Sequence, residues 1–375
     1  MVGGMRMRDI DGTDHAKVNA LWEAVWWPTR SEAGWAWLAA NPAATATDAP
    51  LGWVVEDDHG GLAAILGALP QRFWRNGEAY YGLSGHSLVV TPRLRGASRP
   101  LIERILAQPG FALCYTLNAN VLSHRLYGRF GFVTPPGAVA DAKLSWIIDP
   151  VACAAARGLR RALAARPGLA RRIGERLRPG GRLWRGEPLR LPSGVAEIEV
   201  AGIEAGCAYG DFWERLRAEG GWLADRSPET MRWRLADPDM SAPPLLLGYM
   251  RGGEILGYAC ALFAKENPIE PTVLEIIDIQ ALACAPDAVA TLMDALMAAG
   301  RQRGAAKLRL SMYGPQLFER LGRHRDAARR EGGWPHAHVR ASPGAPALDD
   351  WSPTPFDGDL FMSLRAPPIP LRQSA

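Results

Sequence analysis

Residues 88–102 combine, within a short stretch, the groups that a site for an anionic ligand requires. An apolar run, Leu88–Val90, leads into a loop that contains Arg95, Gly96 and Ser98, and helix-forming sequence follows directly. The N-terminus of a helix presents backbone N–H groups and the positive end of the helix dipole, and a nearby arginine adds a full charge. The sequence therefore predicts a phosphate-binding loop. The alternative is an ordinary strand-to-helix connection whose arginines face solvent.

Two motifs in this region and downstream of it resemble those of the GNAT superfamily of N-acetyltransferases. Val90-x-Pro92-x-x-Arg95-Gly96 before a helix is similar to that family's coenzyme A pyrophosphate loop. Asn120-(x)6-Tyr127-x-x-x-Gly131-Phe132 is similar to the strand–helix segment that follows it. The resemblance covers residues 5–149 well and extends more weakly over 194–364, as in bacterial tandem GNAT proteins.

The resemblance implies an acyltransferase that moves an acetyl group from acetyl-CoA to a primary amine of a small molecule or peptide, with no metal. In that family an asparagine contacts the cofactor arm and a helix-borne tyrosine protonates the departing thiolate, which would be Asn120 and Tyr127 here. Backbone N–H groups of the strand before the loop would hold the acyl-pantetheine arm. The implied cofactor-binding residues are Leu88, Val89, Val90, Arg95, Gly96, Ala97, Ser98, Arg99 and Asn120.

Acylation of an amine also needs a proton acceptor. No carboxylate follows Glu78 on the expected third strand, so His86 is the best candidate for the general base. Side chains alternate along a strand, and we therefore expect His86, Leu88 and Val90 on one face of the sheet. The alternative for His86 is a purely structural histidine.

The loop departs from the family pattern at two small positions, where this chain has Ser98 and Pro100. A serine side chain limits the approach of a phosphate, and proline has no backbone N–H to donate. These departures favour an alternative function, a non-catalytic binding or scaffold protein built from two decayed acyltransferase domains. An acyltransferase that uses a longer acyl-CoA or a carrier-bound donor is a third possibility.

An internal repeat indicates two copies of one domain. Trp37-Leu-Ala-Ala-Asn-Pro42 matches Trp233-Arg-Leu-Ala-Asp-Pro238 at an offset of 196 residues, and 126–131 matches 317–322 at an offset of 191. We expect an α/β (α+β) fold of two tandem acyltransferase-like domains, each a mixed, mostly antiparallel sheet flanked by helices. The expected boundaries are a catalytic domain at 1–150, an arginine-rich linker at 151–190 and a degenerate domain at 191–375.

The second copy lacks the loop and the tyrosine that could bind a cofactor and donate a proton in the first copy. After Ala285-Pro286 the chain enters a helix without an Arg-Gly loop, and Phe318 replaces Tyr127. We therefore expect the second copy to bind no cofactor and to shape the acceptor site. Candidate acceptor contacts, each with a core or surface role as the alternative, are Trp222, Asp225, Trp233 and Asp278.

The expected elements repeat in the two halves. In the first they are a strand (5–9), helical sequence (16–40), a hairpin (52–56 and 62–73), a strand (79–90), a helix (98–109), a strand (111–116), a helix (121–130) and closing strand sequence to 149. In the second they are a strand (196–200), a helix (205–219), a hairpin (245–263), a strand (273–284), a helix (288–303), a strand (307–312), a helix (315–322) and strands near His336 and Leu360.

The composition of the 375 residues excludes several other classes of protein. The net charge of +4 is too small to indicate nucleic-acid binding, although the linker alone has 11 arginines against two glutamates, a net of +9. The five cysteines form no C-x-x-C pair, which argues against a zinc site and for a reducing, cytoplasmic location. No apolar run has the ~20 residues of a membrane span.

Overall fold

The computed structural model of the protein describes residues 6–25, 27–94, 96–138, 142–163, 166, 169, 188–240, 243–264, 270–332 and 336–364. The chain forms two compact units. The first combines residues 1–138, 217–239 and 334–363, and the second combines 139–216, 240–333 and 364–375.

Both units therefore contain segments from both halves of the sequence, whereas the sequence analysis expected contiguous domains at 1–150 and 191–375. The physical reason is strand pairing. Strand β6 (Ala142–Ile147), expected to close the first sheet, pairs with strands of the second unit. Strand β14 (His336–Ala341), expected in the second copy, pairs with β5 (Leu113–Ala119) of the first unit.

The first unit is built on a mixed sheet with the strand order β1-β2-β3-β4-β5-β14, and β8 pairs with β3. The β4–β5 pair is parallel, and the other pairs are antiparallel. The elements are β1 (Arg6–Asp9), α1 (His15–Ala24), α2 (Glu32–Ala39), α3 (Pro42–Thr47), β2 (Gly52–Glu56), β3 (Leu62–Arg75), β4 (Glu78–Val90), α4 (Ser98–Leu106), β5 (Leu113–Ala119), α5 (Val121–Gly128), β8 (Leu223–Ala224), α9 (Pro228–Leu235), β14 and short 3₁₀ helices at Pro92–Leu94, Pro355–Asp357 and Leu360–Ser363.

The helical sequence expected at 16–40 forms two helices, α1 and α2. The Ser31 side chain accepts a hydrogen bond from the Gly34 backbone N–H and so starts α2 as an N-cap. Asn41, with Pro42 at the first helical position, starts α3 in the same way. Short polar residues with capping geometry thus divide a segment whose hydrophobic pattern alone resembles one helix.

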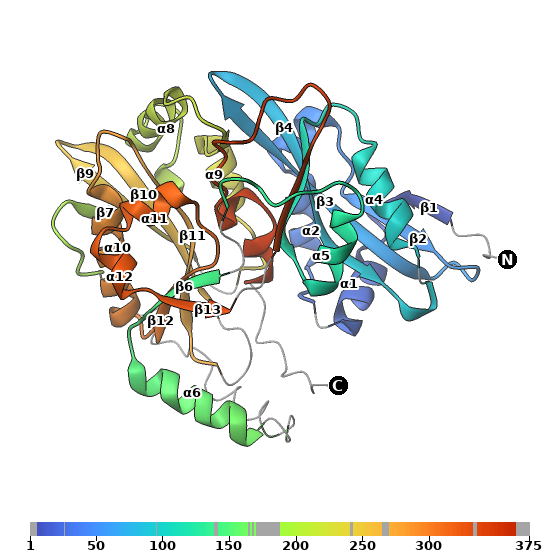
Figure 1. Cartoon of the computed structure of the whole chain (residues 1–375), viewed down its shortest axis with the longest axis horizontal. Helices are drawn as coiled ribbons and strands as arrows, with labels where there is room; N and C mark the ends of the chain where they lie inside the picture. The colour runs from blue at the N-terminus through green and yellow to red at the C-terminus, as the bar shows by residue number, and fades with distance from the viewer. Residues whose placement is uncertain are drawn as a thin grey trace. The chain divides into compact units, whose positions relative to one another are not determined.

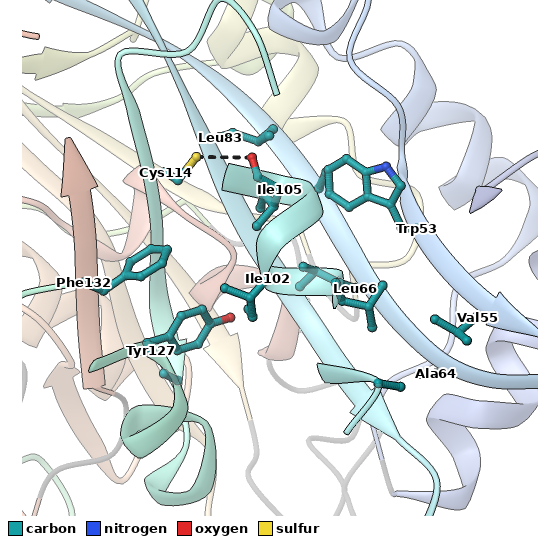
Figure 2. Close-up of a cluster of buried hydrophobic side chains, with 14 of the residues drawn as sticks. Trp53, Val55, Ala64, Leu66, Leu83, Ile102, Ile105, Cys114, Tyr127 and Phe132 are labelled. Carbon is teal, nitrogen blue, oxygen red and sulfur yellow. Dashed lines mark hydrogen bonds between the residues drawn. The ribbon is translucent and has the colours of Figure 1, made fainter. Parts of the chain in front are cut away.

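The core of the first unit lies between the sheet and α4, and Figure 1 shows α4 and α5 on the same side of the sheet. Figure 2 shows side chains from β2, β3, β4, β5, α4 and α5 that interlock here. The cluster comprises Trp53, Val55, Ala64, Leu66, Ala68, Leu83, Ala97, Leu101, Ile102, Ile105, Phe111, Cys114, Ala119, Tyr127 and Phe132. This core fixes α4 and α5, and with them the loop that precedes each helix.

The second unit is built on a sheet with the strand order β13-β6-β12-β11-β10-β9-β7. Its single parallel pair is β11–β12. The elements are β6, α6 (Pro150–Leu163), β7 (Val195–Glu197), α8 (Ala208–Ala218, whose last two residues group with the first unit), β9 (Leu245–Arg251), β10 (Glu254–Ala264), β11 (Val273–Ala281), α10 (Ala288–Gln302), β12 (Lys307–Leu310), α11 (Pro315–Arg320), α12 (Arg323–Ala327), β13 (Arg329–Gly332) and a 3₁₀ turn at Val200–Gly202.

The two sheets share one strand plan. β1 to β5 followed by β14 correspond in order to β7, β9, β10, β11, β12 and β6. The expected fold class, a mixed α/β architecture of two sheets flanked by helices, is confirmed. The strand expected near Leu360 is wrong, because that residue begins a 3₁₀ helix. Most of the expected linker, 170–187 in particular, lies outside the described residues.

The repeated tryptophans that revealed the internal repeat meet in the first unit. The Trp37 and Trp233 rings stack with centroids 4.6 Å apart and planes 5° from parallel. Each indole Nε1–H donates to the other residue's carbonyl oxygen, at 2.6 Å and 2.8 Å. The same position of the repeat therefore pairs with itself, which explains why tryptophan stands at both.

No helix in the described ranges has the length and hydropathy needed to cross a membrane.

Candidate functional site

The parallel strands β4 and β5 separate part of the way along their length. They pair only at Gly82 with Leu113, Leu83 with Cys114, and Ser84 with Tyr115. Beyond that point β4 continues to Val90 along β3 alone. The edge of β4 that faces the gap carries backbone N–H and C=O groups with which an extended ligand can pair as an added strand.

A bulge at Ser87 changes which side chains face which side of β4. Ile65 of β3 pairs with Val89 and Gly67 pairs with His86, so β4 has an extra residue here, and Ser87 has a φ of 52°. A bulge interrupts the alternation of side chains along a strand. The expectation that His86 shares a face with Leu88 and Val90 is therefore wrong. Leu88 and Val90 pack against the α4 core cluster, whereas the His86 ring lies across Gly67 on the other face.

Gly67 provides the space that the His86 ring occupies. A Cβ on Gly67 would lie 2.3 Å from the His86 Cε1 atom, closer than any real contact allows. The ring is buried, and its Nδ1 lies 2.9 Å from the Ser87 hydroxyl oxygen. The imidazole is thus held in one place at the start of the gap between β4 and β5.

Tyr127 reaches β4 from the opposite face. The hydroxyl oxygen lies 3.7 Å from the position that a Cβ on Gly85 would occupy, just past the last β4–β5 pair. Figure 2 shows this hydroxyl directed into the core cluster, toward Ile102. Burial raises the pKa of the Tyr127 phenol, and the Asp359 carboxylate raises it further. Tyr127 therefore stays protonated at neutral pH and can act as a proton donor.

Asn120 is the N-cap of α5. Its side-chain oxygen accepts hydrogen bonds from the backbone N–H groups of Leu122 and Ser123, at 3.0 Å and 2.9 Å. The side chain is exposed at the end of β5. The helix therefore uses the amide oxygen, and a cofactor at this position would meet the amide nitrogen.

A hollow of about 710 Å³ opens at the N-terminus of α4. It contains three of the residues expected to bind the cofactor and two arginines that the sequence analysis missed, Arg129 and Arg340. Its lining residues are Gly96, Ser98, Arg99, Glu103, Leu126, Arg129, Phe130, Gly131 and Arg340. Ala97 is buried beneath the loop, and Arg95 lies outside the described residues.

The three arginines of the hollow come from different parts of the chain. Arg99 forms an exposed ion pair with Glu103 at 2.8 Å. Arg340, on β14, donates to the Phe130 carbonyl oxygen at 2.7 Å, which places its guanidinium beside the segment after α5. Arg129 could have been found in the sequence, because it lies within the Tyr127 motif. No sequence motif indicates Arg340, since only the pairing of β5 with β14 brings it to this hollow.

The segment after β14 covers the other face of β5. The Tyr115 hydroxyl donates to the Asp357 carbonyl oxygen at 2.5 Å, and a Cβ on Gly358 would lie 3.0 Å from Leu117. Asp357 forms a buried ion pair with Arg226. Asp359 is buried as well, and it is a third functional candidate, after Arg129 and Arg340, that was not among the predicted site residues.

The candidate acceptor contacts are all buried, and each has structural partners. The Trp222 indole donates to the Ala347 carbonyl oxygen, and Trp233 stacks on Trp37. Asp225 accepts hydrogen bonds from Arg72, Trp74, Ser227 and Thr230. Asp278 of the second unit accepts a hydrogen bond from the Tyr258 hydroxyl. These contacts stabilise the fold and give none of the four residues a free side chain for an acceptor.

Three histidines meet beside Tyr127. His124 Nδ1 lies 2.9 Å from His338 Nε2, and the His124 and His336 ring centroids are 4.4 Å apart. Burial, together with the smaller effect of the two neighbouring histidines, lowers the pKa of His338 to about 4. Within the part of the chain that the structure describes, no group of three or more His, Cys, Asp or Glu side chains has a geometry that could hold a metal ion.

Comparisons with known proteins bear on the fold. No protein-family model and no curated protein matches the chain. Among solved structures, it is similar to an Enterococcus faecalis protein of unknown function described as a probable N-acyltransferase (15% identity, TM-score 0.53, 90% of this chain and 73% of that one). It is also similar to a GCN5-related N-acetyltransferase from Anabaena variabilis (11% identity, TM-score 0.53, 90% and 73%).

A third similar structure is Saccharomyces cerevisiae N-myristoyltransferase with bound myristoyl-CoA (12% identity, TM-score 0.55, 99% of this chain and 85% of that one). At these identities the likeness shows the fold. The chain has a GNAT-like α/β fold, as these structures do.

Proposed function

We propose that the protein is an acyl-CoA-dependent N-acyltransferase, with acetyl-CoA as its donor and a primary amine as its acceptor. The first unit is the proposed site of the reaction. The observation that carries the proposal is the combination of the β4–β5 gap, the Tyr127 hydroxyl beside Gly85 and the arginine-lined hollow at the start of α4. An extended acyl-pantetheine arm fits a strand edge, and a pyrophosphate fits a helix N-terminus.

In this proposal the donor lies along the edge of β4, with its thioester near Gly85. Backbone groups of Leu88–Val90 hold the arm, and the Gly96–Arg99 segment with Arg129 and Arg340 holds the phosphates. The amine nitrogen attacks the thioester carbonyl, the C–S bond breaks, and the thiolate takes the Tyr127 proton. The raised pKa keeps the phenol of Tyr127 protonated at neutral pH, so its proton is present when the thiolate leaves.

The proton acceptor expected from the sequence is His86. Its ring lies at the start of the gap, on the face opposite Tyr127. This placement is compatible with an amine that approaches from the His86 side while the thiolate leaves on the Tyr127 side.

The second unit is the proposed degenerate copy of a tandem pair. Its sheet repeats the strand order of the first, and Phe318 stands on α11 where α5 has Tyr127. Phe318 stacks on Tyr313 with ring centroids 5.5 Å apart, which is a packing role.

One observation favours a non-catalytic binding or scaffold protein. Pro100 lies in the first turn of α4 and supplies no N–H, and the Glu103 carboxylate shares the hollow with the arginines. Both features weaken a phosphate site.

Isothermal titration with acetyl-CoA, and separately with free coenzyme A, distinguishes the two functions. Binding to the wild-type protein that is weakened in Arg95→Ala and Arg340→Ala, but not in Arg330→Ala on β13, supports the acyltransferase. No binding to the folded wild-type protein favours the scaffold. A positive result leads to a screen in which thiol release from acetyl-CoA is followed with spermidine, glucosamine and a lysine-containing peptide.

A further inference from the structure

Asp359 places a buried carboxyl against β5 where β4 and β5 have separated. The last β4–β5 pair joins Ser84 to Tyr115, and the backbone N–H of Leu117, two residues further along, lies close enough to the Asp359 carboxyl to lower its pKa. Only 2% of Asp359 is exposed. The carboxyl therefore lies at the same level of the sheet as the gap in which the proposed thioester lies.

Asp359 and Tyr127 approach this level from opposite faces. Cys114 belongs to the α4 core cluster, and by alternation Tyr115 faces the other side of β5, where Trp351 and the backbone of Asp357 contact it. Gly358 packs against Leu117 on that same side. Tyr127 belongs to the α4 cluster. A proton donor and a carboxylate thus flank the gap.

The carboxyl is only partly satisfied. Its Oδ1 atom has no hydrogen-bond partner among the described residues. Buried polar atoms usually have partners, so an orphaned carboxylate oxygen indicates a missing one. An amine N–H that enters the gap is a partner of the right kind.

The charged and titratable groups around Asp359 come from three elements. Arg234 on α9 is the cation, Tyr115 on β5 and Tyr127 on α5 are the titratable neighbours, and the Asn118 amide adds a dipole. The pKa of Asp359 is raised to about 7, because burial outweighs the lowering effects of its own N–H, the Asn118 side chain, the Leu117 N–H and Arg234. Near neutral pH such a carboxylate can accept a proton and release it again.

We propose that Asp359, rather than His86, accepts the amine proton during acyl transfer. The inference rests on the function proposed above. As the N–C bond forms, the amine N–H proton passes to Asp359. The C–S bond breaks, and the thiolate takes the Tyr127 proton. Transfer of the proton from Asp359 to the Tyr127 phenolate restores both residues, so the amine and acetyl-CoA give the amide and free coenzyme A.

The test compares four forms of the full chain: wild type, Asp359→Asn, His86→Gln and Asp349→Asn. The last removes an exposed carboxylate of the same segment and is the matched control. Acetyl-CoA is titrated calorimetrically near pH 7 in buffers of different ionisation enthalpy, which gives the number of protons taken up on binding. Thiol release is measured from pH 5.5 to 9 with the fastest amine of the panel.

We expect every form to bind acetyl-CoA within about threefold of wild type. Proton uptake on binding should occur in wild type, Asp349→Asn and His86→Gln and be absent in Asp359→Asn, because the donor further desolvates the carboxyl. Asp359→Asn should lower kcat at least 100-fold and abolish the acid limb of the pH profile near 7, a readout that a structural role would not move.

Equal proton uptake in wild type and Asp359→Asn would overturn the inference even if no amine of the panel reacts. Loss of the acid limb in His86→Gln but not in Asp359→Asn would overturn it as well. Failure of folded wild-type protein to bind acetyl-CoA would instead contradict the proposed function.

Discussion

The N-termini of α4 and α10 follow equivalent strands of the two sheets and have opposite electrostatics. α4 has no acidic residue in its first turn, and arginines surround the hollow at its start. The N-cap residue of α10 is Asp287, whose carboxylate accepts a hydrogen bond from the Tyr249 hydroxyl at 2.6 Å and pairs with Arg251. A carboxylate at a helix N-terminus neutralises the dipole that would attract a phosphate. The N-terminus of α4 can therefore bind an anionic ligand, whereas the N-terminus of α10 already has the Asp287 carboxylate beside it.

The two units also differ in the buried carboxyl group near the point where the parallel strands stop pairing. All of β12 pairs with β11, but β11 extends beyond the last pair, Ile276 with Leu310. Past that point Asp278 accepts hydrogen bonds from Tyr258 on one oxygen and from Gln280 on the other. In the first unit Asp359 keeps one oxygen without a partner in the described part of the chain. Both carboxylate oxygens of Asp278 thus have partners within the second unit, whereas in the first unit one oxygen of Asp359 is available to a ligand.

The largest expected effect concerns the two equivalent aromatic positions. Tyr127→Phe removes the proton donor and should lower kcat about 100- to 10,000-fold, the usual contribution of general acid catalysis, with little change in acetyl-CoA affinity. Phe318→Tyr, the reverse change in the second unit, should leave the rate as it is. Thiol release under saturating acetyl-CoA measures both. Wild-type turnover in Tyr127→Phe would remove the catalytic distinction between the units.

The next effect concerns the pH dependence of stability. The pKa of Asp359 is raised by burial from 3.8 to about 7. A group whose pKa is raised on folding stabilises the folded state below its unfolded pKa, and this contribution is lost as the pH rises through the folded value. The unfolding free energy of wild type minus that of Asp359→Asn should thus fall by about 4 kcal/mol between pH 4 and pH 8, at 1.36 kcal/mol per pKa unit.

Urea unfolding at several pH values, with Asp349→Asn as the control, measures this difference. If the difference in unfolding free energy between wild type and Asp359→Asn did not change with pH, the Asp359 carboxyl would be solvated. The proposed difference between Asp359 and Asp278 would then be wrong.

Giving α4 the acidic start of α10 should weaken cofactor binding. Ser98→Asp places a carboxylate in the hollow, where repulsion of the phosphates should raise the Kd for acetyl-CoA about 10- to 100-fold. Asp287→Ser, which removes the acidic residue from α10, should leave that Kd within twofold. Calorimetric titration measures both constants, and equal affinities for wild type and Ser98→Asp would place the cofactor elsewhere.

The smallest effect is expected from Arg340. Its guanidinium lies at the rim of the hollow, so Arg340→Ala should weaken acetyl-CoA binding about 5- to 10-fold. Because one screened charge contact is lost, the affinity of the variant should also depend less on salt than that of wild type. Arg330→Ala, at Phe318 in the second unit, is the control and should have no effect. The same titrations at low and physiological salt provide the measurement. An unchanged Kd in Arg340→Ala would limit the phosphate site to α4 and its loop.

The sequence by itself determined the local structure. Alternating apolar residues placed the hairpins, and the loop before α4 and the Tyr127 helix were predicted close to their observed bounds, because these depend on residues near one another in the chain. The repeat that contains Trp37 and Trp233 can be recognised in the sequence, and in the structure the two tryptophan rings stack on each other. The tryptophan pair and the strand order common to the two sheets both follow from the internal sequence repeat.

Tertiary structure alone decided the features that join distant segments. The exchange of β6 and β14 between the sheets depends on which edges pair, and local periodicity is the same for either choice. A single bulge residue, Ser87, turned His86 away from Leu88 and Val90, since a one-residue shift reverses every side chain after it. Arg340 and Asp359 reach the site only because β14 pairs with β5 and the following segment covers Leu117. Burial then sets the Asp359 pKa, and burial is a property of the packed chain.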